Sequence, residues 1–352
     1  MSGSGRAVAT IDLGAIERNC ARLAAQGATL CAVVKADAYG HGALAVAEAA
    51  QSGGASWLAV AAADEAAALR EGGIAGPILV MGALTRAELD VAIRADADVV
   101  AWTAEVAEAA PRVHVKLDTG MGRLGTRDRE EALGLAARPN VVGLMTHFAT
   151  ADEPGDDYFE AQLEAFRDFV GQVGRDDLLV HAANSAATLR EPDARFDMVR
   201  CGIAVYGMDP FHEDPARHGL EPALSLESWV GAMRRFERGD SAGYGRRWTA
   251  EAPCWVGTVP IGYGDGWRRA LTNDCDVLIG GRRHAVVGTI SMDNLTVDLG
   301  AETDVRVGDP VVLIGRQGAE RILAEEVARR LDTINYEITC GLLPRVRRRH
   351  LR

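Results

Sequence analysis

Short apolar runs alternate with amphipathic segments along the chain up to about residue 225. The segments between the runs are rich in Ala, Glu and Arg and have helical spacing, which is typical of consecutive strand–helix units. The eight runs are Leu30–Val34, Trp57–Ala61, Ile78–Met81, Val99–Trp102, Val113–Leu117, Val141–Thr146, Leu178–His181 and Met198–Tyr206. Eight such units favour a closed barrel over a doubly wound sheet. We therefore predict an α/β fold in which residues 1–225 form an N-terminal (β/α)8 barrel of the TIM type.

The pattern changes beyond Pro222, where short strands are separated by Gly and Asp turns. The expected strands are Cys254–Val259, Asp276–Ile279, Ala285–Ile290, Leu295–Leu299 and Pro310–Ile314, and the one helical stretch is Ala324–Leu331. We therefore predict a second, mostly-β domain over residues 226–352.

Composition indicates a globular protein and disfavours several kinds of partner. The 352 residues are 48% hydrophobic and 25% charged, and the net charge of −12 disfavours nucleic acid or an anionic membrane. The six cysteines have neither CxxC nor zinc-type spacing, so we expect reduced thiols and no metal. Met1–Ala7 lacks the apolar core of a signal peptide and no apolar run could span a bilayer, so we expect a cytoplasmic protein. The arginine-rich end, Arg345–Arg352, fits a solvated edge better than a binding patch.

Only two of the 38 basic residues are lysines, Lys35 and Lys116. Base-composition drift could produce this bias, but a lysine amine, unlike a guanidinium, can lose its proton, form a Schiff base with a carbonyl or take up CO2. Lys35 follows an apolar run at the end of the barrel where active sites lie, and Tyr39 is four residues later. Burial there would lower the pKa of Lys35, as a nucleophilic amine requires. The alternative is a structural ion pair.

Polar residues also follow the later runs, at the same end of the predicted barrel. They are Lys116, Asp118 and Arg123 after the fifth run, His147 at the sixth, Asn184 and Ser185 at the seventh, and Arg200 and Gly202 at the eighth. Singly these are weak signals, since a lone histidine is more often a core residue and Asn-Ser a helix cap. Ser185 and the backbone N–H groups of Gly202 and Ile203 are placed for phosphate binding. A phosphate site together with a Schiff-base lysine describes pyridoxal 5′-phosphate (PLP).

Motifs along nearly the whole chain resemble the alanine racemase family. The matching segments are Val33–Gly42, Lys116–Gly125, Thr146–Asp152, His181–Ala187, Val199–Gly207, Ala242–Ala250, Ile261–Gly266, Ser291–Asn294 and Asn335–Cys340. The resemblance implies a PLP-dependent enzyme that interconverts L-alanine and D-alanine, which in bacteria would supply D-alanine for the cell wall. It also implies a head-to-tail homodimer with active sites at the interface.

By this resemblance, Lys35 and Tyr244 are the two catalytic residues. Lys35 would bind PLP covalently and then act as one acid/base, and Tyr244, contributed across the dimer interface, would be the other. Two groups are needed because a proton removed from one face of Cα must be replaced from the other. Without the resemblance, Tyr244 would be interpreted as a core tyrosine. Arg200 matches the arginine against the pyridine nitrogen; because it donates a hydrogen bond but keeps its proton, it disfavours PLP reactions that need a strong electron sink.

The remaining site residues are also assigned by resemblance. The matching positions are Tyr39, Ser185, Gly202 and Ile203 for the phosphate, His147 for the pyridine ring, Arg123 and Met292 for the substrate carboxylate, and Asn184, Tyr263 and Asp293 as supporting residues. Lys116 matches a position that is often carbamylated, and the added carboxylate would pair with Arg123.

One position departs from the family, and three alternatives stay open. Some members place a phosphate-binding tyrosine where this chain has Pro344, so we expect weaker cofactor retention. Serine or a broader set of small amino acids is an alternative substrate, because one hydroxymethyl group changes pocket energetics by only about 1–3 kcal/mol. A non-catalytic PLP-binding protein is the alternative of another class, which the domain bearing Tyr244 and Met292 disfavours. A PLP decarboxylase or aldolase is disfavoured by Arg200.

Overall fold

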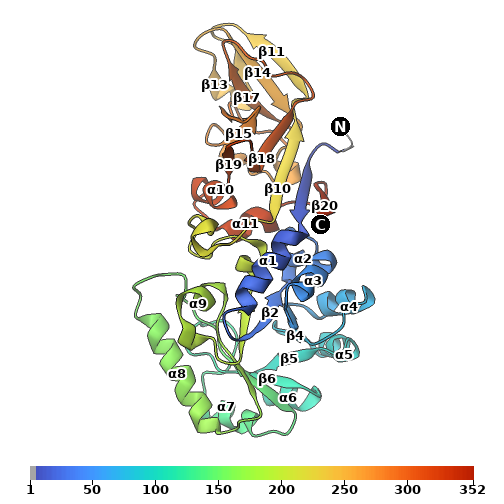
Figure 1. The fold of residues 1–352 in the computed structure, drawn as a ribbon, viewed down its shortest axis with the longest axis vertical. Helices are drawn as coiled ribbons and strands as arrows, with labels where there is room; N and C mark the ends of the chain where they lie inside the picture. The colour runs from blue at the N-terminus through green and yellow to red at the C-terminus, as the bar shows by residue number, and fades with distance from the viewer. Residues whose placement is uncertain (1–4) are drawn as a thin grey trace. The chain divides into compact units, whose positions relative to one another are not determined.

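The chain divides into two compact units in the computed structural model, which describes residues 5–352 (Figure 1). The first, here called the barrel unit, is Gly14–Glu221. The second, the β unit, is Pro222–Arg352 together with the described part of Met1–Leu13. The first four residues of the predicted barrel domain and of the Met1–Ala7 segment lie outside the described residues.

The predicted domains were residues 1–225 and 226–352, and the main difference from the observed units is the N-terminal strand, which belongs to the β unit. Strand β1 (Val8–Asp12) runs antiparallel to β10 (Leu224–Trp229) and parallel to β20 (Arg347–Leu351). Its hydrogen-bond partners are therefore C-terminal segments, and it belongs to the β unit. The arginine-rich end of the chain forms β20, at one edge of that sheet.

The barrel unit contains eight parallel strands, one at each predicted apolar run. They are β2 (Thr29–Val33), β3 (Trp57–Val60), β4 (Ile78–Val80), β5 (Asp98–Ala101), β6 (Val113–Lys116), β7 (Val141–Met145), β8 (Leu179–His181) and β9 (Met198–Cys201). They pair in the order β8-β7-β6-β5-β4-β3-β2-β9. Backbone bonds from Asp197 N to Val180 O (3.0 Å) and from Arg200 N to Ala183 O (2.9 Å) link the two ends of this sheet. The (β/α)8 barrel is confirmed.

The eighth strand is shorter than the pattern predicts. The apolar run is Met198–Tyr206, but β9 ends at Cys201. Gly202 follows with φ −107° and ψ −86°, and Ile203–Tyr206 form a 3-10 turn, η2. All four residues of η2 are buried, so their apolar character reflects burial and not an extended strand.

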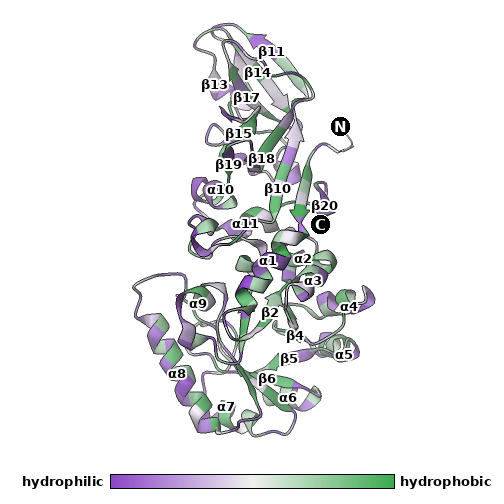
Figure 2. Cartoon of the chain, in the orientation of Figure 1, coloured by the Kyte–Doolittle hydropathy of each residue, from purple (hydrophilic) through white to green (hydrophobic). Residues whose placement is uncertain are grey.

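Helices alternate with the barrel strands and cover them. Their bounds are α1 (Leu13–Ala24), α2 (Lys35–Gly40), α3 (Ala43–Ser52), α4 (Ala63–Glu71), α5 (Arg86–Arg94), α6 (Ala104–Ala109), α7 (Arg129–Ala136), α8 (Tyr158–Val173) and α9 (Ser185–Arg190). Strands β4, β5, β6 and β9 are buried at every residue, as expected for parallel strands covered on both faces. Helix α8 is amphipathic: Figure 2 shows alternating apolar and polar colour along it, and Phe159, Phe166 and Phe169 form its buried side.

The β unit contains three sheets. The largest has the order β16-β15-β18-β10-β1-β20, with β19 also on β18; the others are β11-β14-β17 and β12-β13. Bounds not yet given are β11 (Ala232–Phe236), β12 (Ser241–Ala242), β13 (Trp248–Thr249), β14 (Cys254–Val259), β15 (Asp276–Ile279), β16 (Arg282–Ala285), β17 (Leu295–Gly300), β18 (Pro310–Gln317) and β19 (Glu320–Ile322), with helices α10 (Ala324–Arg330) and α11 (Asn335–Cys340).

The prediction of one strand in this unit, Ala285–Ile290, is wrong. Ala285–Ile290 is not a strand; β16 ends at Ala285, and only Val286 makes an isolated bridge, to Val297. Gly288 interrupts the segment with φ +75°, and a Cβ there would lie 2.5 Å from the carbonyl oxygen of Ala242. The turn therefore requires glycine and ends the extended conformation.

Within residues 5–352, no helix combines the length and the apolar character needed to cross a bilayer. Over the same range, no group of three His, Cys, Asp or Glu side chains is arranged to hold a metal ion. None of the six cysteines forms a disulfide, and five of them are buried.

Candidate active site

Lys35 begins α2 at the C-terminal end of β2, and the backbone after it is unusual. Ala36, Asp37, Ala38 and Tyr39 have φ between 52° and 54°, a left-handed turn. For non-glycine residues this conformation costs roughly 1–2 kcal/mol each. Side-chain carboxylates hold it, since Ala36 N donates to Glu65 Oε1 (2.6 Å) and Ala43 N donates to Asp37 Oδ1 (2.8 Å). These two hydrogen bonds offset part of the conformational free-energy cost in the segment that joins Lys35 to Tyr39.

The left-handed turn places the Tyr39 phenol against Gly202, at the end of β9. A Cβ built on Gly202 would lie 2.3 Å from the Tyr39 hydroxyl oxygen, so only glycine fits there. The Tyr39 ring is 7% exposed and stacks on Tyr206, with ring centroids 4.9 Å apart. The Tyr206 hydroxyl donates to Val33 O (2.7 Å), which ties this stack to β2.

Ser185 meets the same glycine from α9. Its Oγ accepts hydrogen bonds from Gly202 N (3.0 Å) and Ala204 N (3.3 Å), and Ser185 is 2% exposed. Ile203, also predicted for the phosphate, is the first residue of η2. Asn184 is the N-cap of α9 and accepts from Ala187 N (3.0 Å), so its side chain supports the helix that carries Ser185. The structure therefore brings the predicted phosphate-binding residues of the barrel together.

A cluster of cations lies at this end of the barrel. Burial, with the charges of Arg200 and Arg123 next in importance, lowers the pKa of Lys116 to about 8, and Lys35 acts in the same direction. Asp118 opposes the shift, but its carboxylate is engaged by Gly120 N (3.0 Å), Gly122 N and Arg127. Arg123 is exposed and has no hydrogen-bond or ion-pair partner among the described residues. The cluster thus has more positive than negative charge, as a site for anionic ligands requires.

Arg200 is buried, 4% exposed, and is held mainly by neutral acceptors. Its Nη1 lies 2.9 Å from His181 Nδ1, and its Nη2 donates to Thr146 O (2.8 Å) and Ala182 O (3.0 Å) and lies 3.3 Å from His147 Nδ1. Burial lowers the pKa of Arg200 to about 10, so it remains a cation at neutral pH. Burial and the charge of Arg200 hold the pKa of His147 well below its ordinary value, so His147 is neutral.

The predicted residues of the β unit gather on neighbouring loops. Tyr244 begins the turn η4 (Tyr244–Arg246), and its carbonyl accepts from Thr289 Oγ1 (2.6 Å). Tyr263 begins η5 (Tyr263–Asp265), and its N–H donates to Ser291 O (3.1 Å), while Gly264 N donates to Met292 O (2.9 Å). Tyr244 is 73% exposed, Met292 51% and Tyr263 39%. The prediction of a core tyrosine at position 244, made without the resemblance, is therefore wrong.

Two further residues hold this loop cluster, and the sequence did not single them out. Arg345 pairs with Asp293 (2.8 Å) and with Asp265 (3.2 Å), and Asp265 in turn accepts from Gly262 N (3.0 Å). Asp265 is 1% exposed. His181, which holds Arg200, was also missed as a site residue, although it opens the segment His181–Ala187. Its position at the end of an apolar strand, where burial needs a polar partner, was the available signal.

The barrel residues fit a phosphate-bearing aldehyde. Tyr39, Ser185 and the first amides of η2 form a cradle of hydrogen-bonding groups that a Cβ on Gly202 would fill. Lys35 supplies an amine at the adjacent strand end, and the Nε of Arg200 has no hydrogen-bond partner among the described residues. A ring nitrogen could accept from that group.

Comparison with known proteins gives consistent matches over the whole length. Two family models match, "Alanine racemase, N-terminal domain" over residues 11–210 and "Alanine racemase, C-terminal domain" over residues 223–350. Alanine racemase of Geobacillus stearothermophilus is 43% identical over 367 residues, covering 98% of this chain and 94% of the relative. That of Symbiobacterium thermophilum is 41% identical, covering 97% and 96%.

Solved structures match equally well. The crystal structure of alanine racemase from E. faecalis has a TM-score of 0.93 and 38% identity, and covers 100% of both chains. The alanine racemase from Bacillus anthracis with bound L-Ala-P has a TM-score of 0.90 and 38% identity, and covers 100% of this chain and 96% of that one.

Proposed function

The chain belongs to the alanine racemase family, and on that premise we propose that it interconverts L-alanine and D-alanine with PLP as cofactor. The observation that carries the proposal is the buried Arg200, held by carbonyl oxygens and neutral imidazoles at the barrel end that also carries Lys35. A protonated guanidinium donates to a ring nitrogen without protonating it. This arrangement suits a single proton exchange at Cα and disfavours reactions that need a strong electron sink.

The barrel residues would hold the cofactor. Lys35 would bind its aldehyde carbon, Tyr39 and Ser185 with the amides of Gly202 and Ile203 its phosphate, and Arg200 its ring nitrogen, with His147 beside the ring. When bound, PLP withdraws electrons from the substrate and so acidifies its Cα–H bond. What remains for the protein is to fix the ligand, exclude water and move one proton between two positioned groups.

Two groups on opposite faces of Cα are needed for that proton transfer, and we assign them to Lys35 and Tyr244. Tyr244 and Met292 are more than half exposed in the single chain, and Tyr263 on a neighbouring loop is 39% exposed. A group of large, largely apolar side chains exposed on neighbouring loops is typical of an interaction surface. We infer a homodimer in which these loops, with Asp293, complete the site of the other subunit.

The substrate carboxylate has two proposed ligands, the Arg123 guanidinium and the Met292 N–H. Arg123 needs an anionic neighbour to hold its position, and we assign this role to a carbamate on Lys116. A pKa of about 8 leaves a usable fraction of Lys116 as the neutral amine that attacks CO2. With ¹³C-labelled bicarbonate, the protein should show a carbamate ¹³C signal that is absent from Lys116→Met.

Chiral chromatography of L-alanine incubated with the protein and PLP tests the activity. D-alanine should form with the native chain, and formation should fall by about 10⁴-fold or more in Lys35→Ala, because both covalent binding and one acid/base are lost. Borohydride reduction, which fixes the cofactor on its lysine, should label the Lys35 peptide only in the native chain. Labelling without D-alanine would overturn the alanine assignment, and conversion of L-serine in its place would support the broader racemase. The D-alanine would be available for peptidoglycan synthesis.

A further inference from the structure

A chain of side-chain hydrogen bonds leads from Arg200 through the interior of the barrel to Asp98, the first residue of β5. Arg200 Nη1 lies 2.9 Å from His181 Nδ1, and His181 Nε2 lies 2.8 Å from His114 Nδ1. His114 Nε2 lies 3.3 Å from Asp98 Oδ2, and Arg112 Nε donates to Asp98 Oδ1 (2.5 Å). Four residues, one each on β9, β8, β6 and β5, are thus linked in series from Arg200 to Asp98, and Arg112, just before β6, contacts only the Asp98 end.

Burial isolates this chain from solvent along most of its length. His114 and His181 are both 0% exposed, and Asp98 and Arg200 are each 4% exposed. Burial and the charge of Arg200 hold the pKa of His181 well below its ordinary value, so this imidazole is neutral. Burial alone would raise the pKa of Asp98, but hydrogen bonds from His114 and Arg112 outweigh it and lower the value, so Asp98 is a carboxylate.

The two ends permit only one direction of donation. A guanidinium has no acceptor, so Arg200 must donate to His181 Nδ1; a neutral His181 then carries its proton on Nε2 and donates to His114 Nδ1. His114 likewise carries its proton on Nε2 and donates to Asp98, and a carboxylate can only accept. Every bond is therefore satisfied in a single tautomeric arrangement, with a cation at one end and an anion at the other.

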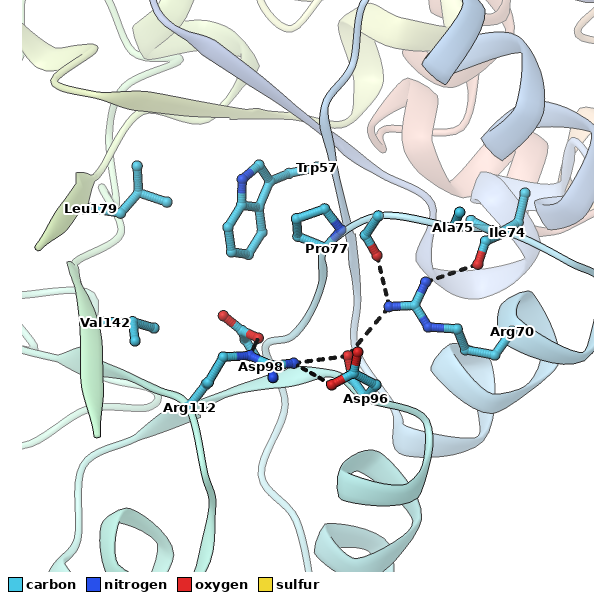
Figure 3. Close-up of a pocket in the computed structure, with 11 residues that line it drawn as sticks. Trp57, Arg70, Ile74, Ala75, Pro77, Asp96, Asp98, Arg112, Val142 and Leu179 are labelled. Atoms are coloured by element: carbon cyan, nitrogen blue, oxygen red, sulfur yellow. Dashed lines mark hydrogen bonds and ion pairs between the residues drawn. The ribbon is translucent and has the colours of Figure 1, made fainter. Parts of the chain in front are cut away.

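The anionic end lies at a cavity of about 660 Å³, and most of its lining residues lie at or just before the N-terminal ends of the barrel strands. Figure 3 shows Asp98 and Arg112 joined there, with Arg112 also bonded to Asp96. Trp57, another lining residue, packs edge-on against His114, with centroids 5.6 Å apart at 80°. Asp96 pairs with Arg112 but makes no hydrogen bond to either histidine among the described residues. Its side chain is 79% exposed, so it is not part of the buried chain.

We propose that Asp98 is a positioning residue for Arg200, acting through His114 and His181. Its carboxylate polarises the two imidazoles toward Arg200, which makes His181 a stronger acceptor and balances a buried cation that has no acidic partner within residues 5–352. The guanidinium is thereby kept in place with its Nε available. The final link, from Nε to the ring nitrogen, rests on the proposed function; the chain from Asp98 to Arg200 does not.

A purely structural ion pair between Asp98 and Arg112 is the competing explanation, and two variants separate it from the proposal. Asp98→Asn removes the charge from the relay, whereas Arg112→Gln breaks the same ion pair but leaves the carboxylate to accept from His114. A structural role predicts equal effects. The proposal predicts that kcat falls about tenfold in Asp98→Asn, with KM for alanine unchanged, and stays near the native value in Arg112→Gln.

The decisive measurement is made on the native protein without substrate, by ¹⁵N NMR of labelled histidines. We expect His114 and His181 both as Nε2–H tautomers, with a scalar coupling across the hydrogen bond from His181 Nε2 to His114 Nδ1. In Asp98→Asn this coupling should weaken or vanish, and in Arg112→Gln it should persist. An Nδ1–H tautomer at either histidine, or equal spectra for the two variants, would overturn the proposal. Neither outcome depends on turnover, so a failure of the racemase assignment would leave this result standing.

Discussion

The two units hold their candidate site residues in opposite ways. In the barrel unit Lys116 and Arg200 are 4% exposed and Ser185 is 2% exposed, and the last two are fixed by hydrogen bonds within the unit. In the β unit Tyr244 and Met292 are more than half exposed. The candidate site residues of the barrel unit are thus largely held in place within that unit, whereas those of the β unit remain exposed in the single chain. Cofactor binding should therefore depend on the barrel alone, and racemisation on both units.

Tyr244→Phe gives the largest effect and separates these two functions. Loss of one proton-transfer group should lower racemisation about 10²–10⁴-fold, while PLP binding stays unchanged because no barrel contact is removed. Lys35 would still exchange the Cα proton of one enantiomer with solvent. In D2O, deuterium should therefore enter one alanine enantiomer without inversion, as mass spectrometry can show. Loss of PLP from this variant would break the comparison.

Mixing subunits gives the control for that variant. Lys35→Ala and Tyr244→Phe chains, each inactive alone, should recover roughly a quarter of native activity after subunit exchange, because half of the dimers are mixed and each mixed dimer keeps one native site. Failure to recover activity despite proven exchange would show that Lys35 and Tyr244 act within one chain.

The same contrast explains what could be predicted from the sequence. Each barrel strand is a buried apolar run, so hydrophobic spacing located β2 to β9 and placed Lys35, Lys116 and Arg200 at strand ends. An apolar run shows that residues are buried but not whether they are extended or helical. For this reason the predicted strand Met198–Tyr206 continued past the end of β9 into the 3-10 turn η2. The left-handed turn after Lys35 could not be predicted, because alanine and tyrosine disfavour that conformation and only the surrounding hydrogen bonds hold it. The relay was missed because Asp98 precedes the apolar run and its partners come from other strands.

In the β unit the hydrophobic pattern located β14, β15, β17, β18 and α10, but the candidate site residues were assigned only by resemblance. The short strands β12, β13, β16 and β19 have too few residues for a period-2 pattern, and β1 and β20 pair with segments remote in the sequence. Tyr244 carries no local signal for its role, since an exposed loop tyrosine and a buried one look alike in sequence.

The pH dependence of stability tests whether the Lys116 amine is shielded from water, as its 4% exposure indicates. Lys116 has its pKa lowered from 10.5 to about 8 in the folded state, so between these values the unfolded chain binds more protons. The free energy of unfolding should rise with pH across this window, by up to about 3 kcal/mol, as the penalty for the buried charge is relieved; below the window that penalty is fully present and Lys116 adds no pH dependence. Urea unfolding in CO2-free buffer measures this. Lys116→Met should lack the rise; an equal rise in both proteins would mean that Lys116 is solvated.

Gly202→Ala tests the close packing of the phosphate cradle. The new Cβ would fall 2.3 Å from the Tyr39 hydroxyl oxygen, and displacing this side chain should cost about 1–3 kcal/mol. PLP affinity of the apoprotein should fall about 10- to 100-fold in a titration followed by absorbance. Gly134→Ala is the matched control, because that glycine lies in α7 with nothing within 4 Å of the new Cβ. Equal affinity in the two variants would mean that the cradle is loose.

Pro344→Tyr is expected to change PLP binding least of these variants. It tests whether the β unit contributes to cofactor retention. Pro344 is exposed and lies beside Arg345, which holds Asp293 in the loop cluster. A tyrosine hydroxyl there could add one hydrogen bond to the phosphate, but replacing proline frees the unfolded chain and costs about 0.4–1 kcal/mol of stability. We expect PLP to dissociate only a few-fold more slowly. Pro344→Phe, which has the ring without the hydroxyl, should show no such slowing. If both variants retain PLP equally, the phosphate is held by the barrel alone, and the contrast between the two units is sharper than the family resemblance implies.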